Sequence, residues 1–293
     1  MGTIAQNNPV AYFFGFIVVM SALVMLSSYL SLYVRTKPAT EKILAHLTRA
    51  KGIFGNIAAS ILGSLTPFCS CTTVPIFAGL LNAGVETGTA MSFLIASPSI
   101  GIASMILLLT LFGYKTAIAY TVASILVAVI GGYVIRMFHV TEPLRRSFVF
   151  IAEEAGPQTG KQALTTAWRM LKHFFPVIIL CALIGVLIEN YIPISLLSIL
   201  TGHNSVWMVP VVVLVGAAIY ADMIVLIPIG FALIEKGVNQ GIVLAFMLAA
   251  AGISVPSVIL LSKVIRPRLL IYFVTTLILL YTALGLVFYF IRT

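Results

Sequence analysis

Charged residues are scarce in this sequence. Only 9% of its 293 residues are Asp, Glu, Lys or Arg, while 61% are hydrophobic and the mean hydropathy is +1.14. Soluble domains carry about 25% charged residues, so this composition excludes a soluble two-domain enzyme. It predicts a protein that crosses a membrane several times.

Several familiar motifs are also absent. The chain has no phosphate-binding G-x-x-x-x-G-K-[ST], no G-x-S-x-G and no H-E-x-x-H, so neither ATP-driven pumping nor a familiar hydrolytic chemistry is predicted. Its three cysteines provide no disulfide framework and are interpreted as free thiols. We therefore expect a protein that is not an enzyme and that uses no cofactor and no bound metal.

The positive charges are clustered. The net charge is +9, and 14 of the 17 Lys and Arg residues lie in three segments, 35–51, 136–172 and 263–268. Loops on the cytoplasmic side of a membrane carry such an excess of Lys and Arg. The clustering places these segments on one side of the membrane, and it indicates contact with membrane lipid and not with nucleic acid.

Long apolar runs fill most of the chain. Residues 10–34 form the first, and a signal peptide is excluded there because no basic residue precedes the run and because the run is too long. The polar stretch 140–172 is interpreted as a cytoplasmic linker. Since about 20 apolar residues span a bilayer, further spans are predicted at 89–112, 116–135, about 174–189, 242–262 and 269–291.

A short segment with a polar tip differs from these runs. Residues 52–66 are too few to cross a bilayer as a helix, and Pro67 and Pro75 disfavour a regular helix through the residues that follow. Irregular backbone at membrane depth persists only where protein buries it or where it lines a cavity. Residues 52–82 are therefore predicted to form a broken re-entrant hairpin. Its tip reads Thr66-Pro67-Phe68-Cys69-Ser70-Cys71-Thr72-Thr73-Val74-Pro75.

The second half of the chain repeats the first at a separation of 153 residues. Between 75–100 and 228–253, nine of 26 positions are identical, and they include Gly84 with Gly237. Glycine and proline matches indicate a shared backbone, so a second hairpin is predicted at about 205–235. The predicted backbone breaks are at Pro67, Pro75, Pro98 and Pro228.

The two halves are predicted to have opposite orientations. Residues 10–34 run toward basic residues, whereas residues 174–189 run away from them. Inverted repeats whose broken helices meet near the midplane are typical of secondary transporters. The predicted fold is all-α and polytopic, with two inverted repeats that each contain about three full transmembrane helices and one re-entrant hairpin. The first repeat comprises residues 1–139, the linker 140–172 and the second repeat 173–293.

The predicted substrate site lies between the two hairpin tips. Cys69 and Cys71 could bind one ligand only if the chain turns between them, because residues two apart point to nearly opposite faces of a helix or strand. Thiolates prefer soft partners such as copper(I) and, by extension, trivalent arsenic. Alternatively, both are small buried hydrophobic residues, as we expect for Cys181. The hydroxyls of Ser70, Thr72 and Thr73 complete this side of the predicted site.

An acidic residue occupies the position that aligns with Cys69 when the two halves are superimposed by sequence. Asp222 lies 153 residues after Cys69, inside an apolar segment. A carboxylate at bilayer depth costs about 2.5–3.5 kcal/mol on insertion scales, so such residues face a cavity, are protonated or are paired. Asp222 is predicted to bind substrate or to couple transport to a proton or another ion. The alternative is a neutral acid that bonds a free carbonyl at the second break.

Two motifs also resemble a known family. Pro67 to Cys71 followed by Pro75-Ile76, and the later Phe93-Leu94-Ile95-Ala96-Ser97-Pro98, are similar to the signature of the ArsP-like (YraQ-type) predicted permeases. Ala221-Asp222, Pro228-Ile229 and Lys236-Gly237 extend the resemblance over nearly the whole chain. It implies a multi-pass permease of the inner (cytoplasmic) membrane, in a family of which some members export trivalent organoarsenicals with the paired cysteines implicated.

These observations together predict a secondary transporter for a small soft or thiol-reactive substrate. One alternative cargo is a sulfur-containing or other small organic metabolite. A membrane thiol redox enzyme is a further alternative, although no cofactor motif or second thiol pair accompanies Cys69 and Cys71. A passive channel is also compatible with the sequence.

Overall fold

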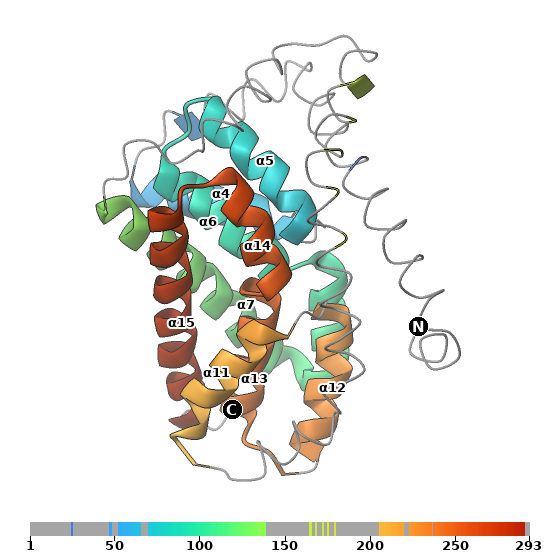
Figure 1. Ribbon diagram of the computed structural model, residues 1–293. Coiled ribbons are helices and arrows are strands. Elements are labelled where there is room, and N and C mark those ends of the chain that lie inside the picture. Colours follow the sequence, from blue (N-terminus) through green and yellow to red (C-terminus); the bar gives the residue numbers. More distant parts are fainter. Residues whose placement is uncertain are drawn as a thin grey trace.

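The computed structural model describes residues 52–65, 70–138, 205–219, 223–235 and 237–290, together with a few isolated positions. Every regular element within these residues is an α-helix, in agreement with the predicted class (Figure 1). The predicted span 10–34, the linker 140–172 and the span 174–189 lie outside these ranges. The helices are α4 (Ile53–Leu65), α5 (Ser70–Asn82), α6 (Thr87–Ser99), α7 (Ile102–Met137), α11 (Met208–Ala218), α12 (Met223–Glu235), α13 (Gln240–Gly252), α14 (Val255–Val264) and α15 (Pro267–Phe290).

Three helical stretches of the described chain are long and apolar enough to cross a membrane. They are Ser104–Met137, Gln240–Val264 and Pro267–Phe290. The predicted span 269–291 coincides with α15, and the predicted span 116–135 lies within α7, after a kink at Gly113 where φ is +79°. A polytopic membrane protein is therefore the class that both composition and helix length support.

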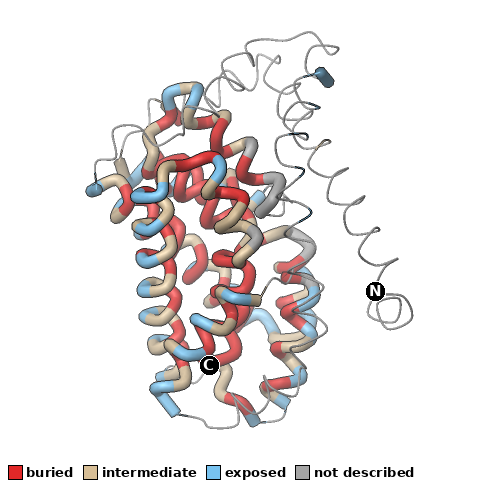
Figure 2. The backbone as a smooth tube through the Cα atoms, in the orientation of Figure 1, coloured by how far each residue is buried: buried red, intermediate tan, exposed pale blue. Residues whose placement is uncertain are grey.

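The outer surfaces of the long helices are apolar. On α7, Ile118, Val122, Leu126 and Ile130 are all exposed and are spaced four residues apart, so they share one face. Figure 2 shows α15 with the same alternation of exposed and buried turns, around a core in which α13 is almost wholly buried. A continuous exposed apolar stripe is unfavourable in water and is what lipid tails solvate.

Two predicted spans are interrupted. The prediction of a full helix over 89–112 is wrong, because α6 ends at Ser99 and Ile100 and Gly101 are extended before α7 begins. The predicted span 242–262 lies within Gln240–Val264, which is long and apolar enough to cross a membrane, but Ile253 and Ser254 are extended between α13 and α14 inside it. The predicted break at Pro98 lies two residues before the first interruption, whereas no break is predicted near the second.

The short helices of the two halves have matching bounds. Helices α5, α6 and the start of α7 coincide with α12, α13 and the start of α14 when 153 is added to each residue number. The ends of α5 and α12 also match, because Gly84 and Gly237 both have positive φ, +83° and +89°. After them, Val85 N–H donates to Leu80 O and Val238 N–H donates to Leu233 O, each at 3.1 Å. Both helices therefore close with the same Schellman motif.

Helix packing repeats as well. A Cβ added to Gly63 of α4 would lie 2.8 Å from the Phe93 carbonyl oxygen of α6, and one added to Gly216 of α11 would lie 2.9 Å from the Phe246 carbonyl oxygen of α13. Each glycine lies 153 residues from its counterpart, as do the two carbonyls. The backbones of α4 and α6, and of α11 and α13, thus approach so closely that only glycine fits.

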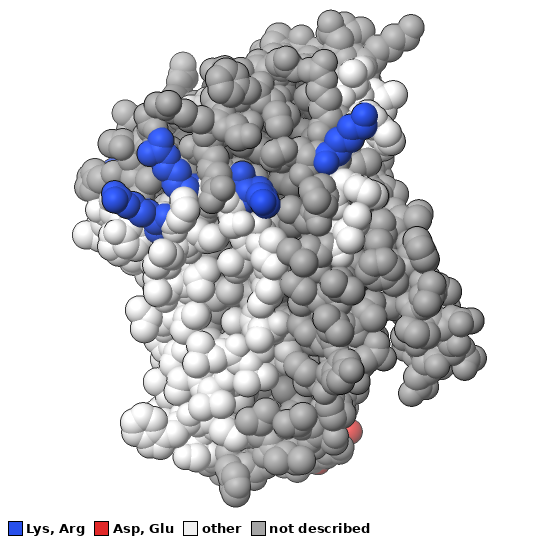
Figure 3. All heavy atoms as spheres, in the orientation of Figure 1, with Lys and Arg blue, Asp and Glu red and all other residues white. Residues whose placement is uncertain are grey.

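The two long helices run antiparallel. The rings of Phe138 and Tyr272 stack with centroids 4.2 Å apart, whereas Gly131 faces Leu277 and Leu280, so residue numbers fall along α7 as they rise along α15. In Figure 1, α5 lies at one end of the molecule and α11 and α12 lie at the other. Basic side chains gather at the first end on the face shown in Figure 3, while most of the described surface below is uncharged.

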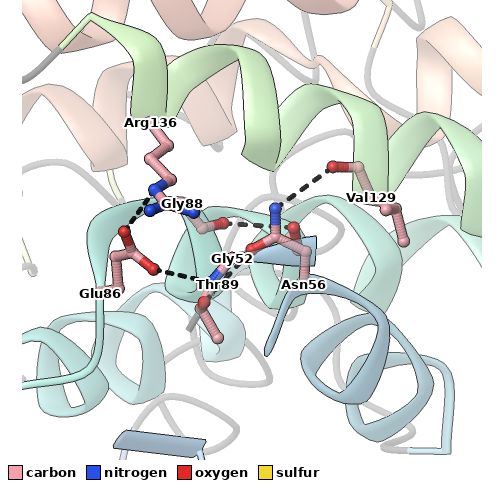
Figure 4. A network of polar contacts seen from close by, with 8 residues as sticks. Gly52, Asn56, Glu86, Gly88, Thr89, Val129 and Arg136 are labelled. Carbon is pink, nitrogen blue, oxygen red and sulfur yellow. Dashed lines mark hydrogen bonds and ion pairs between the residues drawn. The ribbon is translucent and has the colours of Figure 1, made fainter. Parts of the chain in front are cut away.

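A polar network ties the first-half helices together near this basic end (Figure 4). Arg136 in the last turn of α7 forms an ion pair with Glu86, which precedes α6 and also accepts a hydrogen bond from the Gly52 N–H at 3.3 Å. Deeper in the protein, the buried Asn56 of α4 donates to Val129 O at 3.4 Å and accepts from Thr89 Oγ1 at 3.2 Å. The network fixes α4 against α6 and α7 where both helices approach the basic end.

We expect Gly63→Ala and Gly216→Ala to destabilise the protein to a similar extent. Each new methyl group would press on a carbonyl that cannot rotate away, and overpacking of this kind costs about 1–3 kcal/mol. The measurement is the midpoint of thermal unfolding of the purified protein in detergent, with Ser64→Ala, an exposed change on α4, as control. Midpoints equal to that of the control would contradict the close packing.

Candidate substrate site

The two helix breaks are the most irregular part of the described interior. At the first, the Ile100 N–H donates to Ala96 O at 3.2 Å, and at the second the Ile253 N–H donates to Ala249 O at 2.8 Å. The last carbonyls of α6 and of α13 are then left without helical donors. Buried carbonyls in an apolar medium need other partners, so both breaks are polar points within an apolar protein.

A tyrosine hydroxyl donates a hydrogen bond to a backbone carbonyl at the first break. The hydroxyl of Tyr120, on α7, donates to Ser99 O at 3.3 Å and lies 3.5 Å from the Met223 sulfur. Tyr120 is only 2% exposed, and Met223 is the first residue of α12. The end of α6, the middle of α7 and the beginning of α12 therefore meet at one point.

A second pair of hydroxyls lies one turn away. Thr73 of α5 and Ser97 of α6 are hydrogen-bonded at 3.1 Å, and both are buried. The Ser99 hydroxyl donates to Ile95 O at 3.0 Å. Hydroxyls from α5, α6 and α7 thus concentrate around the end of α6, which Pro98 marks in the sequence.

The helices that follow the breaks start with matching serines. Ser104 Oγ accepts from the Gly101 N–H and donates to Gly101 O, each at 2.9 Å, and Ser257 Oγ lies 2.6 Å from Ser254 Oγ. Ser104 and Ser257 are 153 residues apart. The N-termini of α7 and α14 carry partial positive charge, so each break places both a positive and a negative helix end in the interior.

Contacts between the halves are reciprocal. Helix α12 packs against α7, and Phe231 of α12 contacts Phe112 of α7 with ring centroids 5.9 Å apart. Helix α5 packs against α14, which corresponds to the first part of α7. The start of α12 lies at the first break, and near the start of α5 Thr73 bonds Ser97 beside that same break.

The structure describes only some of the predicted site residues. Thr73 is buried at the point described above, and Pro98 and Pro228 lie inside α6 and α12. Ser70, Cys71 and Thr72 form the first turn of α5, and only their backbone is described. Pro67, Cys69 and Asp222 lie outside the described residues.

The prediction that Pro75 prevents a helix is wrong. Helix α5 runs through Pro75 from Ser70 to Asn82, and α12 runs through Pro228 in the equivalent position. A proline in a helix removes only the bond to the carbonyl four residues earlier, which is that of Cys71 or of Ile224. The helix continues because neighbouring helices support it, and those carbonyls become acceptors for other groups.

Sequence reasoning did not identify Tyr120, Met223 or Tyr281 as site residues. Tyr281 of α15 is fully buried, and a Cβ added to Gly252, the last residue of α13, would overlap its hydroxyl oxygen. A tyrosine in the middle of an apolar helix is a signal that could have found Tyr120 and Tyr281. Within the described ranges, no group of three or more His, Cys, Asp and Glu side chains could hold a metal ion.

Comparison with known proteins gives two matches. A family model described as a predicted permease (ArsP_1) matches residues 6–290. A UPF0718 protein of Methanocaldococcus jannaschii is 23% identical over 270 residues, which covers 71% of this chain and 74% of the relative. No solved structure matches.

The bond between Thr73 and Ser97 is predicted to couple α5 to α6. In a double-mutant cycle with Thr73→Val and Ser97→Ala, we expect a coupling free energy of about 1 kcal/mol, because each single change leaves a buried hydroxyl without this partner. Thermal unfolding midpoints in one detergent provide the comparison. Strict additivity of the two changes would show that the two hydroxyls do not interact.

Proposed function

This chain belongs to the predicted permease family ArsP_1, and from that premise we propose that it is a secondary transporter with a substrate site at the two central helix breaks. The observation that carries the proposal is the reciprocal packing of α12 on α7 and of α5 on α14. It brings the start of α12 to the first break, where Met223 contacts Tyr120, and we propose that the start of α5 lies at the second break in the same way. Discontinuous helices that meet at the midplane form the sites of many secondary transporters.

We propose further that the two halves are inverted repeats and that α4–α5 and α11–α12 are re-entrant hairpins. The matching bounds at a separation of 153, the equivalent close contacts of Gly63 and Gly216, and the antiparallel course of α7 and α15 support this arrangement. An antiparallel pair of equivalent helices requires an approximate two-fold axis across them. With α7 and α15 spanning the bilayer, that axis lies in the membrane plane.

The proposed site places the thiols at the second break. Cys71 is the second residue of α5, and the residue equivalent to Ser70 in the other half is Met223, which contacts Tyr120 at the first break. By the same relation, we propose that Cys69 and Cys71 are positioned beside the end of α13. A soft atom there would meet two thiols, while the hydroxyls around Ser99 provide polar contacts.

Asp222 belongs to the same proposed site. It directly precedes Met223 in the sequence, and the Met223 sulfur lies 3.5 Å from the Tyr120 hydroxyl, which supports a proposed place for Asp222 at the first break. A carboxyl group in this position would bind a proton or pair with a cation as access alternates. This gives the transporter a coupling group that the thiols cannot supply.

The cargo we propose is a small thiol-reactive molecule such as a trivalent organoarsenical. A sulfur-containing or other small organic metabolite is the alternative cargo, since the hydroxyls around Ser99 would bind it equally well. A thiol redox enzyme would require a partner that reoxidises or reduces Cys69 and Cys71 in the interior. The family match favours transport over that chemistry.

Substrate should protect the thiols from modification. We expect methylarsonous acid, a trivalent organoarsenical, to slow the reaction of Cys69 and Cys71 with N-ethylmaleimide at least tenfold in the purified full chain, because arsenic–sulfur bonds remove the thiolates. Mass spectrometry of the labelled peptides measures each cysteine separately. Cys181 is the internal control, and we expect its labelling rate to stay the same.

Transport provides the matching test. Replacing Cys69 and Cys71 with Ser should abolish efflux of the arsenical from proteoliposomes, whereas Cys181→Ser should retain it. Normal flux in the double variant would exclude a role for the thiols. Protection of both thiols relative to Cys181 by mercaptoacetate, with N-ethylmaleimide in excess over the probe because the thiol of mercaptoacetate also consumes it, and without protection by the arsenical, would assign the site to the metabolite cargo instead.

The orientation of the halves can be tested independently. Single cysteines placed at Pro38, Gly156 and Asn204 in a chain without native cysteines should report the first two positions in the cytoplasm and the third outside. The reason is that basic loops stay inside and that inverted repeats put equivalent hairpins on opposite sides. Labelling with a membrane-impermeant maleimide in whole and lysed cells distinguishes the sides. Gly156 and Asn204 on the same side would exclude the inverted arrangement.

A further inference from the structure

The two helix breaks are not equally satisfied. Each has a buried tyrosine hydroxyl beside it: Tyr120 at the end of α6 and Tyr281 at the end of α13. The Tyr120 hydroxyl bonds Ser99 O and contacts Met223. The Tyr281 hydroxyl is fully buried and has no hydrogen-bond partner among the described residues, which makes it different from every other buried side-chain donor and acceptor in that part of the chain.

The 153-residue repeat does not relate Tyr281 to Tyr120. The residue 153 positions before Tyr281 is Ala128, and the residue 153 positions after Tyr120 is Phe273, so neither tyrosine has an equivalent in the other half. The Tyr281 hydroxyl occupies the space that a side chain at residue 252 would need, and it fits there because residue 252 is glycine. The Ser99 side chain lies close enough to interact with Tyr281, although no hydrogen bond of good geometry joins them. Tyr281 of α15 therefore lies beside a residue of each break, Ser99 at the end of α6 and Gly252 at the end of α13.

An unsatisfied hydroxyl in an apolar interior is costly. Leaving such a group without a partner costs about 1–3 kcal/mol, so buried hydroxyls are retained without a protein partner where a bound molecule supplies one. A tyrosine hydroxyl is a good donor to a carboxylate, hydroxyl or other oxygen. The α13 end beside it belongs to the break at which we have placed the start of α5.

We infer that Tyr281 is a substrate-binding residue whose hydroxyl donates a hydrogen bond to an oxygen atom of the transported molecule. This inference rests on the proposed function and makes it more specific. The thiols would hold a soft atom, and Tyr281 would select, among soft molecules, those that also carry an oxygen acceptor. Methylarsonous acid and mercaptoacetate both meet this requirement, so the inference applies to either cargo.

The test is Tyr281→Phe, which removes the hydroxyl and keeps the ring. With the purified full chain, we expect the affinity for methylarsonous acid or mercaptoacetate, measured as the dependence of the unfolding midpoint on probe concentration, to fall about tenfold. Without probe, the midpoint should stay the same or rise, because an unsatisfied hydroxyl has been removed. Efflux from proteoliposomes should show a higher KM for the probe that binds.

Tyr120→Phe is the matched control. It also removes one hydroxyl from a buried tyrosine at a break, but that hydroxyl already bonds Ser99 O. We expect this variant to lower the unfolding midpoint in the absence of probe. Gly252→Ala, which would displace the Tyr281 hydroxyl, should reproduce the loss of affinity of Tyr281→Phe.

The outcomes separate the inference from the proposed function. If the wild-type protein and the Tyr281→Phe variant bind a probe with equal affinity, the inference is overturned and the proposed transporter function still stands. A clear fall in the unfolding midpoint of Tyr281→Phe without probe would also overturn it, because the hydroxyl would then serve the fold. If the wild-type protein neither binds nor transports the arsenical or the sulfur-containing metabolite, the proposed function is overturned, and the inference with it.

Discussion

The structure depends on how buried backbone groups are satisfied where a helix stops inside an apolar protein. Helix α6 stops at Ser99, and the carbonyl of Ser99 would be orphaned if Tyr120 did not donate to it. On the other side of the break, Ser104 bonds both backbone groups of Gly101. These few bonds let a chain with little charge interrupt a helix at depth, and the interruption creates polar groups that a substrate could bind.

The same backbone is stabilised by different side chains in the two halves. At the second break, Ser254 and Ser257 pair with each other, and the nearby Tyr281 hydroxyl forms no hydrogen bond with any residue that the structure describes, whereas Tyr120 donates to the end of α6. What is shared is the geometry that depends on glycine: the helix ends at Gly84 and Gly237 and the close approaches at Gly63 and Gly216. Glycine fixes a backbone because no other residue fits, whereas a hydrogen bond can be supplied from several positions. The four matched glycines therefore fix the shared backbone, whereas the hydroxyls are matched at Ser104 and Ser257 but not at Tyr120 or Tyr281.

This difference also explains what the sequence could and could not predict. The all-helical class, the long C-terminal helix and the 153-residue relation follow from composition, glycines and prolines, whereas Gly113, predicted to lie between two separate spans, is a kink inside α7. The predicted break at Pro98 lies two residues before the interruption at Ile100, but no predicted break lies near Ile253, and the partner that stabilises the first interruption, Tyr120, is distant in sequence from Ser99. Pro75 was overestimated as a helix breaker, since local propensity ignores the neighbouring helices that support α5. The roles of Cys69 and Asp222 stay predictions, because both lie outside the described residues.

The long helical stretches of the two halves are interrupted by joints at equivalent positions. In the first half, Gly113 has a non-helical backbone between the two parts of α7, and in the second half Ile265 and Arg266 separate α14 from α15, with Arg266 153 residues after Gly113. If alternating access exchanges the conformations of the two halves, these joints are where the backbone has to change, because the glycine contacts on either side hold each half rigid. Gly113 tolerates both backbone conformations at little cost, and Pro267 favours the start of a new helix. Motion would then be confined to the two joints and the breaks beside them, while the lipid-facing stripes of α7 and α15 keep their surface.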